Sequence, residues 1–507
     1  MQTLDTLSDK SRQAFNNDDW RVDGLPRIIF PIRFINATGF GLGPQLFASI
    51  CLFFIEILLV RPALQKSLHQ MEQAEKNGKI SYLLCNGQAR HDMKERLQNY
   101  KKDVNNCSSL TCVAKIMNYM AAVKCLRNHQ GLLALGEDAH HEKVITPIFI
   151  ASLPRTGSTI LHRVMALDRN RWRSFDFCDQ MLPLSPAPIP RNNENARAQL
   201  AKTASKLMKG MELMYPGWHA CLASVHALEV DQANEDHVWY NSALGHPYVG
   251  TLMLLHREER EKANTNGGVS PLNSKECARY RYAWIDMILR IYQHFERKDL
   301  PSKNEKTEEY LPWLMKDPRH ASFLPELLSQ FPDAKLIFTH RLPVDLFPSV
   351  TKLLICNTCT FHTPGSIGTT SEEWGKEILI RTKFLCDSLI SFTKDHEGSD
   401  LGCSKFTYNK EDETSNHNIK NSSISTLKST RRFDIRFEDF VLDIPAVIQK
   451  IYTQLFPDQP GPTDEVLNKF KSYIQQNRSK STQRYKLEDF HLSKDDLAFP
   501  VYVNLFC

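Results

Sequence analysis

The chain has 507 residues, of which 42% are hydrophobic and 24% are charged, which predicts a globular protein with one large domain plus additions, or with two domains. The formal net charge of +5 suits an anionic ligand but does not indicate a nucleic-acid binder. Thirteen cysteines, an odd number spread over a long chain, argue against a disulfide scaffold.

Residues 34–60 form the most apolar part of the N-terminal region, with Glu56 as their one ionised side chain. The densest part, 46–60, is shorter than the ~20 residues that a membrane-spanning helix needs. Flanking arginines and a glycosylation sequon at Asn36 favour a membrane anchor, whereas a glutamate in lipid is costly. We therefore favour a buried helix, and a cytoplasmic protein, over membrane association through this segment.

Residues 62–135 show charged and apolar positions interleaved at helical spacing, for example at Leu64, Leu68 and Met71. They predict an N-terminal helical region over residues 1–140. A main domain is expected over residues 141–507.

Residues 148–167 are predicted to form a strand, a tight turn and a helix. An apolar run at 148–153 gives the strand, the turn covers 154–159, and apolar residues at helical spacing follow from Ile160. Free backbone N–H groups at the start of such a helix favour an anion. The stretch therefore predicts an oxyanion site.

The side chains of this turn support the same interpretation. Gly157 lets the backbone approach a ligand, Ser158 and Thr159 offer hydroxyl donors, and Arg155 adds a positive charge. The simpler interpretation is an ordinary turn with a helix N-cap. A nucleotide P-loop fits less well, because the turn has one glycine and its arginine precedes it, where a P-loop has a lysine that follows.

A second stretch, 313–349, has the pattern of a strand, a polar turn, a helix and another strand. The first strand ends at Lys316, and His320 follows in the turn. The second strand leads to Arg341, and Ser349 lies eight positions further on.

Together the two stretches resemble the sulfotransferases that use 3′-phosphoadenosine-5′-phosphosulfate (PAPS). The turn is similar to that family's P-R-[ST]-G-[ST]-T loop, and residues 314–320 are similar to its L-K-x-P-x-H motif. Residues 331–334 and 340–343 match its F-P-D-A and H-R-x-P elements. The resemblance implies a P-loop-like α/β fold with three layers, in which helices flank a central parallel sheet, and an N-terminal helical cap.

The resemblance also implies how the donor is held. The turn would bind the 5′-phosphosulfate, and the residues after the second strand would bind the 3′-phosphate. These donor-binding residues are Arg155, Thr156, Gly157, Ser158, Thr159, Arg341 and Ser349. Lys316 would stabilise the leaving phosphate in an in-line transfer that uses no metal.

The general base is open between two places in the chain. His320 matches the family's histidine and titrates in a useful range. His226 or Glu229, on an acidic segment that resembles the acceptor side of the family, is the alternative. His162 and His340 lie on apolar elements and are expected to be core histidines.

Several segments have no counterpart in the family. Insertions are expected near 258–274 and 296–310, and the low-complexity tract 395–430 is expected to be disordered. By contrast, residues 433–440 resemble the family's Y-E-D-L element and predict a last core strand. Cys356 and Cys359 could hold zinc or form a redox pair, although packing is the expected role.

Two other functions remain open. A kinase would need the P-loop lysine and a metal-binding acid after a strand, where this chain has His340 and Arg341. A non-catalytic member of the family could bind the donor without using it. The acceptor of a sulfotransferase could be a carbohydrate, a lipid, a phenol or another small molecule carrying a hydroxyl or an amine, and no nucleic acid is expected as a partner.

Overall fold

The computed structural model describes most of the chain: residues 44–107, 110–181, 184, 188–191, 193–214, 229–236, 275–298, 311–359, 371–402, 430–477 and 486–507. The chain divides into two compact units that alternate along the sequence. We call them the helical unit (1–144, 175–309 and 351–374) and the sheet unit (145–174, 310–350 and 375–507). The division predicted between residues 140 and 141 stays a prediction.

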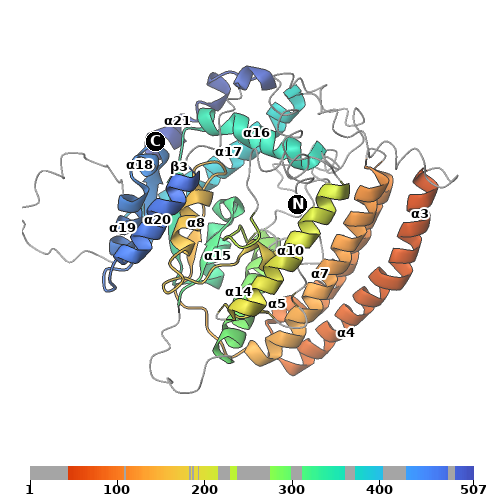
Figure 1. Ribbon diagram of the computed structural model, residues 1–507. Helices are drawn as coiled ribbons and strands as arrows, with labels where there is room; N and C mark the ends of the chain where they lie inside the picture. The colour runs from red at the N-terminus through yellow and green to blue at the C-terminus, as the bar shows by residue number, and fades with distance from the viewer. Residues whose placement is uncertain are drawn as a thin grey trace, which may run out of the picture. The chain divides into compact units, whose positions relative to one another are not determined.

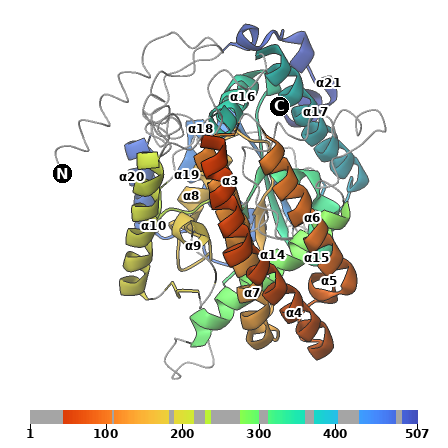
Figure 2. The same ribbon diagram turned by 90° about the vertical axis from the view of Figure 1, so that its right-hand side faces the viewer.

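Where the structure describes it, the helical unit consists of α-helices and one π-helical turn, η2. Its elements are α3 (Pro44–Ile55), η2 (Glu56–Val60), α4 (Arg61–Asn77), α5 (Tyr82–Cys85), α6 (Gly87–Asn106), α7 (Cys112–Ala139), α9 (Phe177–Met181), α10 (Glu194–Met214) and α14 (Lys275–Lys298). Helix α7 lies beside both α3 and α4, which follow one another along the chain (Figures 1 and 2). The N-terminal helices expected from the sequence are therefore present.

Helix α7 is the centre of this unit and is buried along much of its length. Thr111 caps its start, because the side-chain oxygen accepts a hydrogen bond from Ala114 N at 3.1 Å. Near the other end, a Cβ added to Gly136 would lie 2.9 Å from the sulfur of Met287 in α14. The glycine therefore allows α7 and α14 to pack closely.

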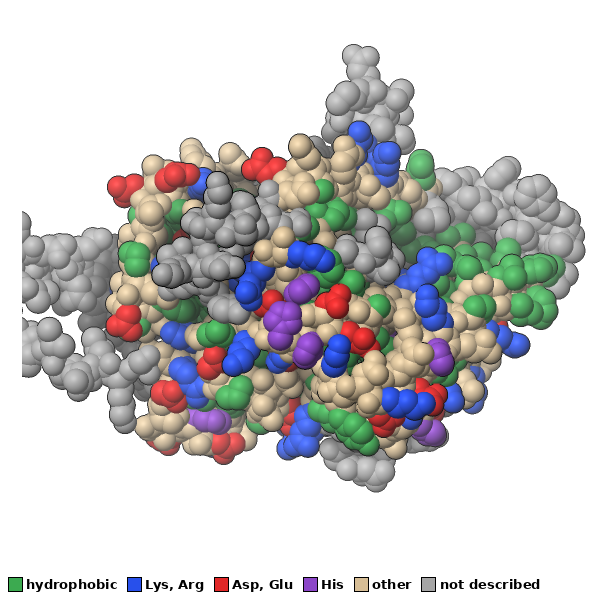
Figure 3. Space-filling view, turned by 90° about the horizontal axis from the view of Figure 1, so that it is seen from below, with side chains coloured by type: hydrophobic (Ala, Val, Ile, Leu, Met, Phe, Trp, Pro, Cys, Tyr) green, Lys and Arg blue, Asp and Glu red, His purple; other side chains and the backbone are tan. Residues whose placement is uncertain are grey.

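Of the apolar segment 34–60, which was expected to be a buried helix, residues 34–43 with the sequon at Asn36 lie outside the described residues, and the described part is helical but only half buried. Residues 44–60 form α3 and η2 and continue into α4. Leu52 and Val60 are buried, whereas Phe53 and Leu58 are 60% and 65% exposed. Figure 3 shows hydrophobic side chains at its right-hand edge, on the side where Figure 1 places α3. The expectation of burial is wrong for this face, because α7 packs against the other side of the helix.

Glu56, the charge within this apolar segment, has two cationic partners. Its carboxylate lies 3.3 Å from Arg61 Nε and 2.8 Å from Lys101 Nζ, so its charge is neutralised within the helical unit. In the part of the chain that the structure describes, no helix has both the length and the hydropathy needed to cross a membrane.

Within its described residues, the sheet unit contains four parallel strands in the order β2-β1-β3-β4. They are β1 (Ile148–Ile150), β2 (Leu314–Lys316), β3 (Lys335–His340) and β4 (Arg432–Arg436). Ile150 is the register partner of Lys316 in β2 and of Ile337 in β3. A parallel order with β1 in the middle needs long connections, and helices supply them.

Helices cover both faces of this sheet. They are α8 (Ser158–Ala166), α15 (Leu324–Gln330), α16 (Pro343–Cys359), α17 (Ser371–Asp395), α18 (Phe437–Leu442), α19 (Ile444–Leu455), α20 (Asp464–Asn477) and α21 (Pro500–Phe506), with short 3-10 helices η5 (Pro318–Ser322), η7 (Leu487–Phe490) and η8 (Asp495–Leu497). Helix α16 begins in the sheet unit and continues into the helical unit.

Alternation along the strands assigns each side chain to one of the two faces. Ile148, Ile150 and Ile337 belong to a core shared with α8, α19 and α20, which lie next to one another in Figures 1 and 2. Phe149 points to the other face, against Phe331. The three-layer α/β arrangement predicted from the sequence is confirmed. The predicted last strand is shorter than expected, since β4 ends at Arg436 and α18 follows.

Candidate active site

The turn after β1 and the ends of β2 and β3 meet at one edge of the sheet, because all three strands are parallel. Ala151 N donates to Ile337 O at 3.0 Å, which continues the pairing of β1 with β3 beyond the strand itself. The predicted donor-binding residues of the two distant sequence stretches therefore share this edge.

The turn itself has an unusual backbone. Gly157 has φ +84° and caps α8, with Leu161 N donating to Gly157 O at 3.1 Å. Arg155 has φ +67°, in the left-handed region where an arginine is uncommon. Backbone strain of this kind is stored at ligand-binding sites more often than elsewhere. The turn thus has the helix N-terminus expected of an oxyanion site.

Gly157→Ala is expected to destabilise the sheet unit by about 1–2 kcal/mol, because alanine adopts positive φ at that cost. Its Cβ would also lie 3.3 Å from the rings of Phe437 and Phe440. Chemical denaturation measures the change. Gly461→Ala is the control, since no atom lies within 4 Å of its Cβ position and its φ is not positive. Equal unfolding midpoints for the two variants would contradict the account.

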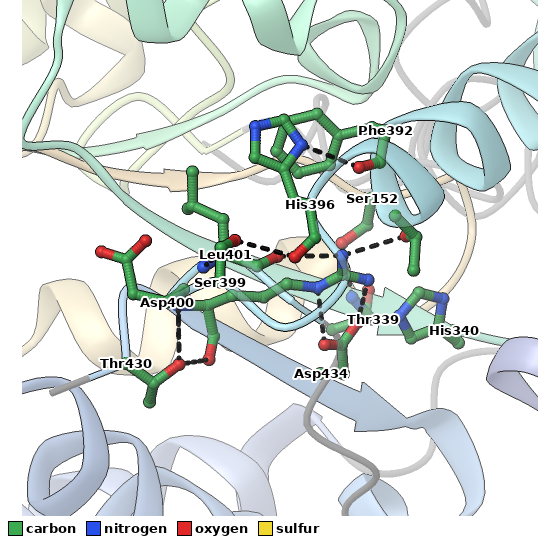
Figure 4. A network of polar contacts seen from close by, with 12 residues as sticks. Ser152, Thr339, His340, Phe392, His396, Ser399, Asp400, Leu401, Thr430 and Asp434 are labelled. Carbon is green, nitrogen blue, oxygen red and sulfur yellow. Dashed lines mark hydrogen bonds and ion pairs between the residues drawn. The ribbon is translucent and has the colours of Figure 1, made fainter. Parts of the chain in front are cut away.

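The Thr156 hydroxyl points into the fold. It donates to Leu153 O at 2.7 Å and lies 2.6 Å from the hydroxyl of Thr339 in β3. Ser152 adds a second link, because its hydroxyl oxygen accepts from Thr339 N at 2.7 Å (Figure 4). Both side chains hold the turn against β3, so the hydroxyl of Thr156 acts within the protein.

Arg155, Ser349 and Arg341 form a continuous link between the two stretches. Arg155 Nε donates to Ser349 Oγ at 2.9 Å, and Arg341 Nη1 donates to Arg155 O at 3.2 Å. The Arg341 guanidinium also lies over the ring of Phe437, 4.3 Å from its centroid. The two predicted arginines are therefore brought together, and both are fixed in position.

The environment of Arg341 leaves it charged. Burial lowers its pKa below the ordinary value, while the carboxylates of Asp345 and Glu438 act in the opposite direction. A guanidinium remains protonated at any physiological pH. Arg341 thus offers a fixed, partly desolvated positive charge, which interacts more strongly with an anion than an exposed one does.

Lys316 reaches the same turn from β2. Its side chain is buried, and Nζ donates to Thr159 Oγ1 at 3.1 Å. His320, four residues later in η5, is fully buried, with its ring 5.1 Å from that of Phe149 in an edge-to-face contact. The structure therefore places the cation beside the turn and the histidine ring against the sheet.

Part of the chain matches a known protein family. Residues 147–384 match the sulfotransferase family. The matched region contains the turn after β1, Lys316, Arg341 and Ser349. No curated protein matches the chain.

Two solved sulfotransferase structures have a similar fold. Sulfotransferase STF9 from Mycobacterium avium has a TM-score of 0.60 and 17% identity, covering 86% of this chain and 94% of its own. Sulfotransferase STF1 from Mycobacterium tuberculosis H37Rv has a TM-score of 0.51 and 16% identity, covering 85% of this chain and 97% of its own. At this identity the likeness concerns the fold, and it confirms the predicted fold class.

Behind the site, the sheet unit has a buried polar network that holds the end of β3. Arg432 donates to both carboxylate oxygens of Asp434, at 2.7 and 2.9 Å. The ring of His340 contacts Asp434 at 2.8 Å and the Tyr502 hydroxyl at 3.1 Å, as Figure 4 shows for Asp434. His340 is therefore a core histidine, as predicted, and the network holds it in place directly before Arg341.

His162 is also a core residue. It is buried in α8, and its Nε2 lies 3.3 Å from Leu314 O. Glu229 lies in a turn of the helical unit, where its carboxylate contacts the side chain of Gln232. His226 lies outside the described residues.

Other predictions fall on segments that are described in part. Insertion 258–274 lies outside the described residues, as does the insertion 296–310 beyond residue 298. The tract 395–430 is described over 395–402 and at 430. Cys356 and Cys359 belong to α16, and their proposed roles stay predictions.

Sequence reasoning missed the residues that support the site from a distance. Phe437 contacts Gly157 and Arg341, yet it follows β4 and no motif spacing connects it to either residue. Ser152 and Thr339 were read only as parts of strands. A signal for Ser152 was present, since a polar residue within an apolar strand requires a hydrogen-bond partner.

Proposed function

We propose that this protein is a sulfotransferase that moves a sulfuryl group from PAPS to a hydroxyl or amine of a small-molecule, lipid or carbohydrate acceptor. The observation that carries the proposal is the link from Arg155 to Ser349 and Arg341. It joins a helix N-terminus to a second cationic site, and PAPS carries two anionic groups on its ribose, a phosphate at the 3′ position and a phosphosulfate at the 5′ position. Two separate anion sites in one binding region suit such a donor.

The turn fits the 5′-phosphosulfate end. The backbone N–H groups of Gly157, Ser158 and Thr159 lie at the start of α8, where the helix dipole favours an anion. Arg155 adds a charge within the same turn. This end of the donor would therefore bind through backbone groups that cannot reorient.

Arg341 and Ser349 fit the 3′-phosphate. Ser349 Oγ accepts from Arg155, so its own O–H is available to donate to a phosphate oxygen. The guanidinium of Arg341 can donate two parallel hydrogen bonds to the same group. Nucleotides without a 3′-phosphate would lack both interactions.

Lys316 is proposed to stabilise the leaving group. The acceptor atom attacks sulfur, the bond from sulfur to the 5′-phosphate oxygen breaks, and negative charge collects on that oxygen. A cation beside Thr159 can offset this charge as it develops. The acceptor proton passes to a base, for which His320 remains the first candidate and Glu229 or His226 the alternative. Adenosine 3′,5′-bisphosphate leaves, and the transfer uses cationic side chains in place of a metal ion.

Incubating the full chain with sulfur-labelled PAPS and an extract fractionated by acceptor class tests the activity. We expect label to enter one class of acceptor, and Arg155→Met and Arg341→Met to lower the rate of transfer strongly when the donor concentration is limiting. Tight donor binding without transfer to any fraction would overturn the catalytic assignment in favour of a donor-binding protein.

Arg341→Met is expected to weaken binding of adenosine 3′,5′-bisphosphate roughly 10- to 150-fold, the value of a charged hydrogen bond. Methionine keeps much of the apolar contact with Phe437. Binding of adenosine 5′-phosphate should change little, because it has no group for this residue.

Calorimetric titration of both nucleotides makes the comparison, and Lys383→Met, which changes an exposed cation of α17, serves as the control. A similar loss of affinity for both nucleotides would mean that Arg341 attracts anions without contacting the 3′-phosphate, and it would reject a 3′-phosphate site.

A further inference from the structure

We propose a binding site for a divalent transition metal of the zinc type in the helical unit, formed by His141, Glu142 and His294. This histidine–glutamate cluster lies where α7 and α14 end. One ligand atom from each residue lies within 4.8 Å of the other two. Figure 3 shows histidine side chains gathered beside acidic and basic ones on the face seen from below.

The separations within the cluster fit an ion better than a direct hydrogen bond. His141 Nε2 lies 3.4 Å from Glu142 Oε1, and His294 Nδ1 lies 3.7 Å from the same oxygen. Both distances exceed the usual range for N–H···O bonds, about 2.7–3.2 Å. Two ligands of one tetrahedral zinc, at bonds of about 2.0–2.1 Å, are roughly 3.3 Å apart. Small side-chain movements would place an ion between these atoms.

The carboxylate is held in place by the protein. The Glu142 side chain is 2% exposed, and Arg297 Nη1 donates to its Oε2 at 3.0 Å. The same nitrogen is 3.2 Å from Oε1, so an ion at Oε1 would leave Arg297 on Oε2. A charged group on the second oxygen orients a ligand in the way that outer partners do at metal sites.

The backbone around the cluster is also fixed. Gln293 Nε2 donates to Lys143 O at 2.9 Å, and Arg290 Nη1 donates to His140 O at 3.3 Å. These bonds join the end of α7 to α14. They bring residues 141 and 142 close to residue 294 without any ligand, so little ordering would accompany binding.

The chemistry of the donor set selects the class of ion. Two imidazole nitrogens and one carboxylate oxygen suit zinc, cobalt, nickel or copper, whereas magnesium and calcium prefer oxygen ligands throughout. The His141 side chain is 55% exposed, which leaves a fourth position open to water. A three-ligand site with an exposed histidine should bind with moderate affinity.

Among the described residues, two other groups have a similar composition but fit less well. His91, Asp92 and Glu95 offer one imidazole on an exposed face. Asp176 and Asp179 both pair with Arg197, and burial raises the pKa of Cys178 to about 12, so its thiol stays protonated. The Arg197 guanidinium already supplies the positive charge that a metal ion would bring to these two carboxylates.

Titration of the chelator-treated full chain with Zn²⁺, and with Co²⁺ for its visible absorption, tests the site. Because cysteines of the chain can also bind zinc, the decisive quantity is the difference between variants. We expect the double variant His141→Ala/His294→Ala to bind one equivalent of metal fewer than the wild type, or to bind that equivalent at least tenfold more weakly. Zn²⁺ should raise the thermal midpoint of the wild type, and the double variant should lack this rise.

His91→Ala is the matched control and should bind like the wild type. Equal stoichiometry and affinity in the double variant and the wild type would overturn the proposal. Loss of the same equivalent in His91→Ala would also overturn it, because the ion would then belong to the exposed group.

Discussion

Lys316→Met is expected to lower kcat by about 10²- to 10³-fold, the usual effect of removing one group that stabilises developing negative charge. The side chain is buried at the end of β2, and its Nζ lies 3.1 Å from Thr159 Oγ1. Methionine has a similar length and fills the same space without the charge. Because the charge develops on the leaving oxygen during the reaction, kcat should fall further than the affinity for the donor.

Steady-state kinetics with the acceptor identified as above measures this effect. Lys335→Met is the matched control, because Lys335 begins β3 at the opposite edge of the same sheet, with its ammonium 4.0 Å from the Phe456 ring centroid. A kcat within threefold of the wild type for Lys316→Met would remove Lys316 from the proposed chemistry. A loss confined to donor binding would instead make it a binding residue.

Arg432→Met is expected to lower the free energy of unfolding by about 3–5 kcal/mol, which is typical when one partner of a buried ion pair is removed. Arg432 is fully buried and also donates to the Thr393 hydroxyl at 2.9 Å. Without it, the Asp434 carboxylate would remain buried with His340 as its main partner. The neighbouring Arg431 is the control: its side chain is 25% exposed and pairs with Asp400 at the surface.

Arg431→Met should lower the free energy of unfolding by less than about 1 kcal/mol, because ion pairs at the surface contribute little to stability. Urea denaturation followed by tryptophan fluorescence compares the two variants. Equal losses for both arginines would contradict the role of the buried network.

The same buried network predicts in which direction the free energy of unfolding changes at acid pH. Burial by itself would raise the pKa of Asp434, but the hydrogen bond with His340 and the charge of Arg432 outweigh it and lower the pKa. A carboxyl group whose pKa is lower in the folded state stabilises the fold above its unfolded pKa, about 3.9. This contribution is lost as the pH falls from that value through the folded pKa.

Local patterns in the sequence predicted much of the site. The strand, turn and helix over 148–167 and the strand ends at Lys316 and Arg341 follow from apolar periodicity and small residues. Such signals depend on neighbours in the chain. The meeting of Arg341 with the Gly157 turn could be expected only because parallel strands end at one edge of a sheet and because the motifs resemble a family.

What the sequence left open depends on contacts between distant residues. The stacking of Phe437 on Arg341 requires β4 to lie beside β3, and β4 comes from a part of the chain without a motif of comparable specificity. The exposed face of α3 was missed for a related reason. Apolar content predicts that a helix packs, but not how many neighbours it has.

The interleaving of the two units has a consequence for how the protein is made. The chain passes from one unit to the other after residues 144, 174, 309, 350 and 374, so no cut yields either unit as one continuous fragment. On the ribosome, β1 emerges long before either strand that pairs with it. At ordinary translation rates this delay is roughly 10–30 s, during which an apolar strand has no partner in its sheet. We therefore expect chaperones that bind exposed apolar segments to bind this nascent chain until β2 and β3 have been synthesised.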